Sequence, residues 1–247
     1  MKYTVEIIGF TIEGCMIAQE AGANRIELCD NPNEGGTTAS YGFIKMAREK
    51  LHIDLYPMIH PRGGEFFYSD EEFEIIKKDV KLCKELGCNG VVIGALTKQG
   101  KVDKEKCSLL VNLAYPLGVT FHRAFDRAAD PFEALENIIE IGCERILTSG
   151  QKPTAIEGAQ LIKQLISRAD DRIIIMPGSG VRSDNVAALA ESTGAVEFHS
   201  SARIRVPGKM TYINPLMNEN SDSITVDGNE VGSLIKSLSA IKIPENP

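Results

Sequence analysis

The sequence lacks the short motifs that identify the most common enzyme classes. It has no Gly-x-Gly-x-x-Gly after its first apolar run, no Walker loop, no His-Glu-x-x-His and no Gly-x-Ser-x-Gly. Each of these motifs holds a nucleotide, a zinc ion or a reactive serine in a defined geometry. The chain therefore has no nucleotide cofactor motif, and these motifs assign it no reaction.

Paired cysteines and excess positive charge are missing as well. Six cysteines occur at positions 15, 29, 83, 88, 107 and 143, and none form a Cys-x-x-Cys pair, which argues against a zinc knuckle or a redox dithiol. The formal net charge is −7. A protein that binds nucleic acid through its phosphates needs a basic face, so we expect no nucleic-acid partner.

Long apolar segments are absent too. No run approaches the roughly 20 residues that span a bilayer, and residues 1–6 show none of the zones of a signal peptide. We therefore expect a soluble, cytoplasmic protein without a membrane partner. The length of 247 residues is usual for one α/β barrel, so we expect residues 1–247 to form a single domain.

Eight short apolar runs alternate with helix-like segments. They occupy residues 3–8, 25–29, 53–60, 90–94, 119–123, 145–149, 173–177 and 195–200. Strands that alternate with helices form a parallel sheet, and eight such units close into a (β/α)₈ TIM-type barrel with its active face at the carboxyl ends of the strands. We expect long loops after the second and third strands. From about residue 204, we expect an extended loop at 205–222 and a final helix near 229–240, packed on the barrel.

Helix ends are marked by local residues. Ser69 with Glu72 forms a capping box ahead of a helix, and Asp130 precedes another. Four glycines each follow an amphipathic segment and precede an apolar run, as expected of left-handed helix ends. They are Gly22, Gly87, Gly142 and Gly194.

Soft metal donors meet on two neighbouring strands. Side chains alternate along a strand, so Glu27 and Cys29 share one side of the second strand, and Met58 and His60 share one side of the third. If both sides face the barrel axis, a thiol, a thioether and an imidazole come together, which suits Cu(I). Core packing of the cysteine and methionine is the alternative. His60 is also a candidate catalytic residue.

Acid–base groups end several strands. His122, Arg123 and Asp126 follow the fifth strand, and Glu6 and Glu27 lie at comparable depth in the first two. Imidazoles and carboxylates can transfer protons, so we take Glu6, Glu27, His122 and Asp126 as candidate catalytic residues. The alternatives are an ion-paired rim, and structural pairing of the two glutamates with Arg25, Arg62 or Arg123.

A glycine-rich loop after the seventh strand predicts an anion site. Glycine lets backbone N–H groups approach an anion, and the loops after strands seven and eight hold phosphate in many barrels. A tight turn that needs glycine is the alternative. The residues expected around the anion are Arg62, Arg123, Ser149, Gly178, Ser179, Gly180, His199 and Arg203.

Seven segments together resemble the CutC family, named for copper homeostasis. They are RIELC (25–29), EGGTTAS (34–40), MIHPRGG (58–64), FYS (67–69), TFHRAFD (120–126), LTSG (147–150) and FHSSAR (198–203), in order along nearly the whole chain. The resemblance implies a cytoplasmic, oligomeric TIM-type barrel that binds Cu(I), with Cys29 as a ligand. His60 stands where the family often has arginine.

Two functions stay open at this point. One is a role in copper homeostasis through Cu(I) bound by Cys29, Met58 and His60. The other is a barrel enzyme of unassigned reaction that acts on a small anionic or phosphorylated metabolite. In either case we expect a homo-oligomer whose partner is a copper ion or a small molecule.

Overall fold

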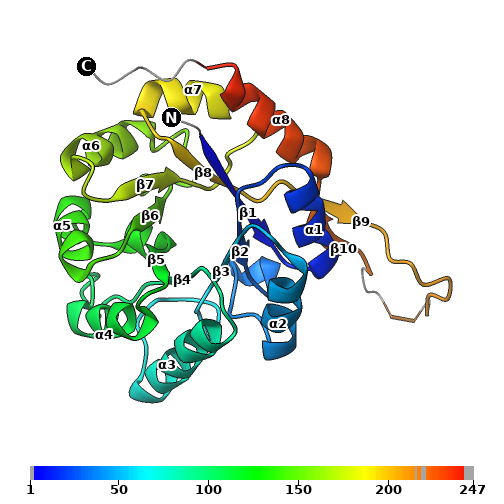
Figure 1. The fold of residues 1–247 in the computed structure, drawn as a ribbon, viewed down its shortest axis with the longest axis horizontal. Coiled ribbons are helices and arrows are strands. Elements are labelled where there is room, and N and C mark those ends of the chain that lie inside the picture. Colours follow the sequence, from blue (N-terminus) through cyan, green and yellow to red (C-terminus); the bar gives the residue numbers. More distant parts are fainter. Residues whose placement is uncertain (1–2, 215, 218–220, 242–247) are drawn as a thin grey trace.

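The computed structural model describes residues 3–214, 216–217 and 221–241. In Figure 1 an inner ring of strands is surrounded by helices. The ring strands are β1 (Thr4–Gly9), β2 (Arg25–Leu28), β3 (Asp54–Pro57), β4 (Gly90–Ile93), β5 (Gly118–Phe121), β6 (Arg145–Thr148), β7 (Ile174–Pro177) and β8 (Glu197–Ser200). Each of the eight apolar runs overlaps one of these strands, and the predicted barrel is confirmed.

Seven helices each follow one ring strand and connect it to the next. They are α1 (Ile12–Glu20), α2 (Tyr41–Lys50), α3 (Asp70–Glu85), α4 (Lys104–Ala114), α5 (Pro131–Ile141), α6 (Ala159–Ala169) and α7 (Val186–Thr193). Two short 3₁₀ turns, η1 (Pro32–Glu34) and η2 (Arg123–Arg127), lie in the loops after β2 and β5. None of the helices in the described residues is both long and apolar enough to cross a membrane.

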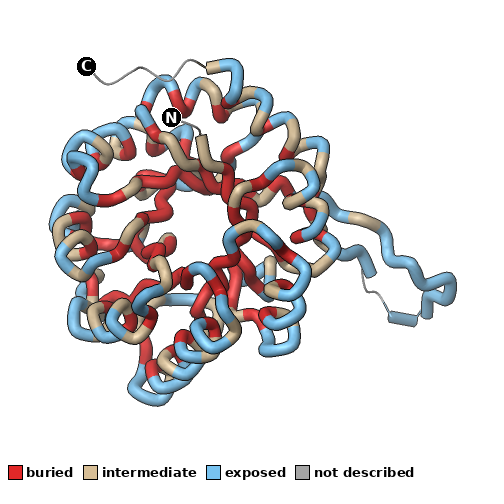
Figure 2. The backbone as a smooth tube through the Cα atoms, viewed as in Figure 1, coloured by how far each residue is buried: buried red, intermediate tan, exposed pale blue. Residues whose placement is uncertain are grey.

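The ring consists of two four-stranded parallel sheets, ordered β3-β2-β1-β8 and β4-β5-β6-β7. They meet where Met58 pairs with Val92 and the N–H of Ile59 donates to the Val92 carbonyl at 2.8 Å, and where β7 lies beside β8. Figure 2 shows the ring buried and the outer faces of the helices exposed. Because all eight strands are parallel, their carboxyl ends share one mouth.

Local residues set the helix boundaries as predicted. Ser69 caps α3, and the Glu72 side chain accepts the Ser69 N–H at 2.9 Å to complete the capping box. Asp130 accepts from two backbone N–H groups at the start of α5. The four helix-ending glycines have left-handed φ values of 99° (Gly22), 74° (Gly87), 91° (Gly142) and 80° (Gly194).

The segment after β8 differs from the prediction of one extended loop at 205–222. Strands β9 (Arg203–Val206) and β10 (Ser223–Val226) form an antiparallel hairpin that projects beside the barrel in Figure 1. The composition of the loop hid the alternating apolar residues of these two strands, which pair with each other. Residues 215 and 218–220 of the predicted loop lie outside the described residues.

The final helix, α8 (Gly228–Ser239), lies close to the predicted range of 229–240. It buries Val231, Leu234 and Leu238 and contacts α1, α7 and β1. The spacing of these three residues places them on one helix face, which explains why the helix packs on the barrel.

Candidate functional site

A cavity of about 470 Å³ opens at the mouth formed by the strand carboxyl ends. This volume lies in the range of small-molecule sites. Nine predicted site residues line it: Glu27, Met58, His60, Arg123, Asp126, Ser179, Gly180, His199 and Arg203. Phe66, Arg127, Gln151 and Lys152 also line it, and the sequence analysis did not select them.

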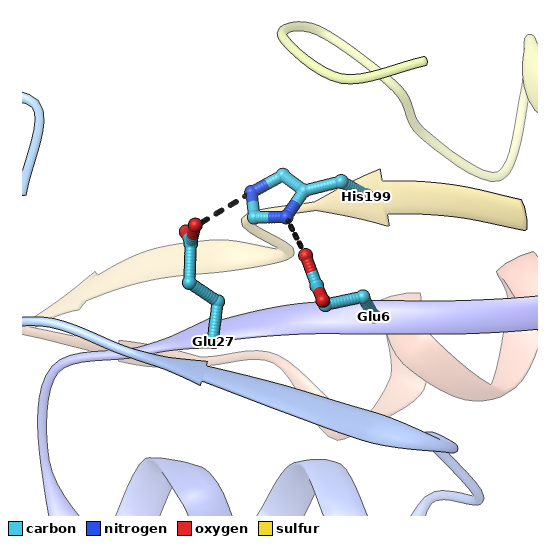
Figure 3. A group of neighbouring side chains, drawn as sticks. All are labelled: Glu6, Glu27 and His199. Atoms are coloured by element: carbon cyan, nitrogen blue, oxygen red, sulfur yellow. Dashed lines mark hydrogen bonds and ion pairs between the residues drawn. The ribbon is translucent and has the colours of Figure 1, made fainter. Parts of the chain in front are cut away.

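Three neighbouring strands bring Glu6, Glu27 and His199 together (Figure 3). Glu6 on β1 lies opposite His199 on β8, and Glu27 extends from β2. The His199 Nδ1 is 2.7 Å from Glu6 Oε1, and its Nε2 is 3.8 Å from Glu27 Oε2. The imidazole therefore stands between two carboxylates, with Glu27 on the same cavity wall.

Arg25 holds the Glu6 carboxylate in place. The Arg25 Nε donates to Glu6 Oε2 at 2.5 Å, and both side chains are buried. Burial alone raises the pKa of Glu6, but Arg25 and His199 outweigh it and lower that pKa to about 2. Because an ionised carboxylate only accepts, the proton of this contact lies on His199 Nδ1, and Nε2 faces Glu27.

Glu27 and His199 form an acid–base pair. Burial raises the pKa of Glu27 to about 7, although His199 opposes the shift. Burial lowers the pKa of His199, but Glu27 and Glu6 outweigh it, so the pKa lies above its ordinary value. A carboxyl group that titrates near neutral pH beside an imidazole can give or take a proton.

Asp126 orients its neighbours rather than reacting. Its carboxylate accepts from Thr148 Oγ1 at 2.5 Å, the Ser149 N–H at 3.0 Å, the Gln151 N–H at 3.1 Å and Arg123 Nε at 2.8 Å. An acid with four donors on it has little capacity left for proton transfer. We therefore do not retain Asp126 as a catalytic residue.

Ser149 belongs to the same network and does not reach the cavity. It is fully buried, and its Oγ accepts from Arg123 Nη2 at 2.8 Å. Together Ser149 and Asp126 hold the Arg123 guanidinium, whose side chain is 42% exposed and lines the cavity. Of these three, only Arg123 is placed to contact an anion.

Four basic side chains line the cavity, and we call them the basic wall: Arg123, Arg127, Lys152 and Arg203. Ser179 and Gly180 lie beside them in left-handed conformation, with φ of 77° and 76°. The Ser179 hydroxyl donates to the Pro153 carbonyl, and no hydrogen bond from the Ser179 or Gly180 N–H is found within the described chain. These two backbone groups are therefore free to bind an anion.

Three predicted residues lie away from this wall. The Arg62 guanidinium contacts Glu72 and three carbonyls of its own loop, so it stabilises the loop instead of clamping an anion. Gly178 is needed for packing, because an added Cβ would lie 2.4 Å from the Leu147 side chain. His122 is fully buried and does not line the cavity.

The three predicted Cu(I) donors, Cys29, Met58 and His60, come together only in part. The Cys29 Sγ is 3.8 Å from the Met58 Sδ, a separation that two sulfurs on one Cu(I) can have. Cys29 is fully buried, and burial followed by the nearby Glu27 raises its pKa well above the ordinary value. His60 uses Nδ1 to donate to the Gly36 carbonyl at 2.9 Å. Two sulfurs therefore fit Cu(I), but the thiol must lose its proton in a setting that opposes ionisation.

Glu6, Glu27 and His199, which we call the buried triad, offer a second arrangement that could bind a metal ion. Ligand atoms of Glu6, Glu27 and His199 lie within 4.8 Å of one another. Oxygen and nitrogen donors suit divalent ions more than Cu(I). Because Arg25 already neutralises Glu6, the triad is better explained by the hydrogen bonds that orient His199.

Comparison with known proteins gives one consistent family. The CutC family matches residues 3–204. A CutC family protein of Parabacteroides distasonis is 51% identical over 215 residues, which cover 87% of this chain and 88% of the relative. A Mus musculus protein named copper homeostasis protein cutC homolog is 47% identical over 212 residues, covering 86% of this chain and 78% of the relative.

A solved structure agrees with this assignment. The copper homeostasis protein CutC of Streptococcus agalactiae has a TM-score of 0.77 and 34% identity, covering 81% of this chain and 98% of the other. The β9–β10 hairpin lies almost wholly beyond residue 204, where the family match ends.

Proposed function

The chain belongs to the CutC family, and from the geometry of its cavity we propose that it acts as an enzyme on a small anionic, carboxylated or phosphorylated, metabolite. The observation that carries this proposal is that one cavity joins the acid–base pair Glu27–His199 to the basic wall. Barrel stability needs neither, whereas a reaction on an anion needs both.

Each group has a defined task in this proposal. The basic wall and the N–H groups of Ser179 and Gly180 bind the anionic end of the substrate. Glu27 and His199 Nε2 move a proton at the reacting atom. Glu6 acts through His199, because it fixes which ring nitrogen carries the proton and which faces the cavity.

Binding of inorganic phosphate, followed by calorimetry, tests the anion site. We expect Lys152→Ala and Arg203→Ala each to weaken binding about tenfold, since each removes one charge contact. Lys101→Ala is a matched control, because Lys101 pairs with Glu133 on the surface and does not line the cavity. Unchanged affinity in both wall variants, together with no anion co-purifying with the protein, would remove the proposal.

A second proposal, a cytoplasmic role in copper homeostasis by binding Cu(I) as cargo, has one specific observation in its favour. The Cys29–Met58 sulfur pair has a suitable separation, and relatives carry copper homeostasis names. Homo-oligomerisation belongs to this proposal as well, and light scattering of the purified chain tests it.

Competition with a Cu(I) chelator tests the copper proposal. Cys29→Ala is expected to abolish stoichiometric Cu(I) binding, and Met58→Leu to weaken it. Cys107→Ala is the control, since Cys107 is equally buried and its thiol donates to the Ala95 carbonyl. If Cys29→Ala binds as the parent does, this site does not hold copper.

A further inference from the structure

Three buried polar atoms near the cavity have no hydrogen-bond partner among the described residues. They are Nε2 of His60, Nε2 of His122 and Oη of Tyr68. These residues are 2%, 0% and 2% exposed. Leaving one such atom unpaired destabilises the folded state, so a folded protein keeps few of them. Several in one place indicate that something binds there.

The three side chains are neighbours. The His60 ring centroid is 6.1 Å from that of His122 and 6.1 Å from that of Tyr68. Phe66 lies against both imidazoles, at 5.1 Å from His60 and 4.6 Å from His122. Because His60 and Phe66 line the cavity, the group borders the space that the basic wall also borders.

Backbone contacts determine the proton position on each ring. The His60 Nδ1 lies 2.9 Å from the Gly36 carbonyl, which only accepts, so Nδ1 carries the proton and Nε2 has a free lone pair. The His122 Nδ1 accepts the Ala124 N–H at 3.1 Å, so in the neutral ring Nε2 carries the proton. One imidazole therefore offers an acceptor and the other a donor.

Both rings are buried, and burial favours the neutral form of an imidazole. Burial, followed by the electrostatic interaction with the neighbouring His60 ring, lowers the pKa of His122 to about 3. Burial also lowers the pKa of His60, although its bond to Gly36 opposes the shift. A neutral donor beside a neutral acceptor does not attract an ion. It matches a hydroxyl group, which accepts one hydrogen bond and donates another.

Resting on the proposed enzyme function, we propose that His60, His122 and Tyr68 form a neutral subsite for a hydroxyl group of the substrate whose anionic end meets the basic wall. His122 Nε2–H donates to the hydroxyl oxygen, and His60 Nε2 accepts its proton. The substrate class is then a hydroxylated anion, such as a polyol or sugar phosphate. Phe66 has to rotate aside, because neither Nε2 atom has exposed surface.

Two phosphate esters of equal chain length test the subsite. We expect xylitol 5-phosphate to bind the parent protein at least tenfold more tightly than n-pentyl phosphate, as measured by calorimetry. In His60→Phe and His122→Phe this preference is expected to disappear, while the affinity for n-pentyl phosphate is retained. His52→Gln is the control, because His52 is exposed and lies outside the cavity wall.

The outcomes separate this inference from the function on which it rests. Equal affinity of the two esters for the parent protein overturns the subsite alone, and leaves an ordered water as the partner of the three atoms. No binding of either ester overturns the anion site and the subsite together. Tyr68→Phe, which keeps the ring packing, supplies a variant that folds if a histidine variant does not, and a partial loss of the preference is expected there.

Discussion

Two sets of buried polar side chains occupy opposite ends of the same barrel, and they differ in whether their members are paired. At the amino ends of the strands, Glu197 accepts from Arg25 at 2.7 Å and from Arg145 at 2.6 Å, and Arg145 also contacts Glu144 at 2.8 Å. At the carboxyl ends, Glu27 Oε1 and the Nε2 atoms of two histidines have no partner among the described residues.

This difference distinguishes the buried polar side chains that stabilise the fold from those that are available to a ligand. Burial of a charge is tolerated when the partner is another side chain, and such a set needs nothing from outside the chain. A buried polar atom without a partner in the protein can still form a hydrogen bond with a ligand or with water. Glu6 joins the two sets, since Oε2 contacts Arg25 and Oε1 contacts His199.

The largest expected effect comes from breaking the paired set. Arg25→Met leaves Glu6 and part of Glu197 without a counter-charge, and we expect the free energy of unfolding to fall by about 3–5 kcal/mol. Urea denaturation measures it. Arg172→Met is the control, because its partner Glu136 is on the surface and the loss of stability should be much smaller there. Equal losses in the two variants would contradict the comparison.

Glu27→Gln is expected to act in the opposite direction. The folded pKa of about 7 exceeds the ordinary 4.5, so the native state binds the proton more tightly, and stability falls as pH rises from about 4.5 to 7. Replacing the carboxylate should therefore raise the free energy of unfolding by about 1–3 kcal/mol at pH 8 and leave it unchanged at pH 4. Urea denaturation at both pH values measures the effect; destabilisation at pH 8 would show that attraction between Glu27 and His199 outweighs the cost of burying the carboxylate.

Glu6→Gln tests the residue that joins the two sets. Loss of one adjacent negative charge should lower the pKa of His199, because the Glu6 carboxylate helps to raise it. An NMR titration of the His199 ring measures the shift and shows which nitrogen holds the proton. A pKa of His199 equal to that of the parent would mean that Glu6 does not position the imidazole.

The smallest effect is expected at Arg62. Its side chain is 37% exposed and its contacts lie within one loop, so Arg62→Ala should lower the free energy of unfolding by about 1 kcal/mol or less. Phosphate affinity should not change, in contrast to Arg123→Ala, for which we expect about a tenfold loss. A tenfold loss in Arg62→Ala would return this residue to the anion site.

Much of the fold could be predicted from short-range patterns. The eight apolar runs, the capping box at Ser69 and the helix-ending glycines act within a few residues, so the sequence shows them directly. The β9–β10 hairpin was missed because its strands pair across an intervening loop. That residues 1–247 form one domain stays a prediction.

The site could be predicted only as a set of candidates. Residues at strand ends were found because strand ends share one mouth, and most of them line the cavity. Arg127, Lys152 and Phe66 lie in loops, where no periodicity marks an inward side chain. For Arg62 the anion role stays a prediction: β3 ends at Pro57, and the guanidinium contacts Glu72 from within the loop that follows.

By itself, the sequence determined the alternation of strands and helices, the caps that end them, and a set of polar candidates at the strand ends. Only the tertiary structure decided which of those residues are paired, which ring nitrogen of His60, His122 and His199 carries the proton, and which atoms are left for a ligand. The physical reason is that pairing depends on contacts across strands far apart in the chain, and these exist only when the ring of strands has closed.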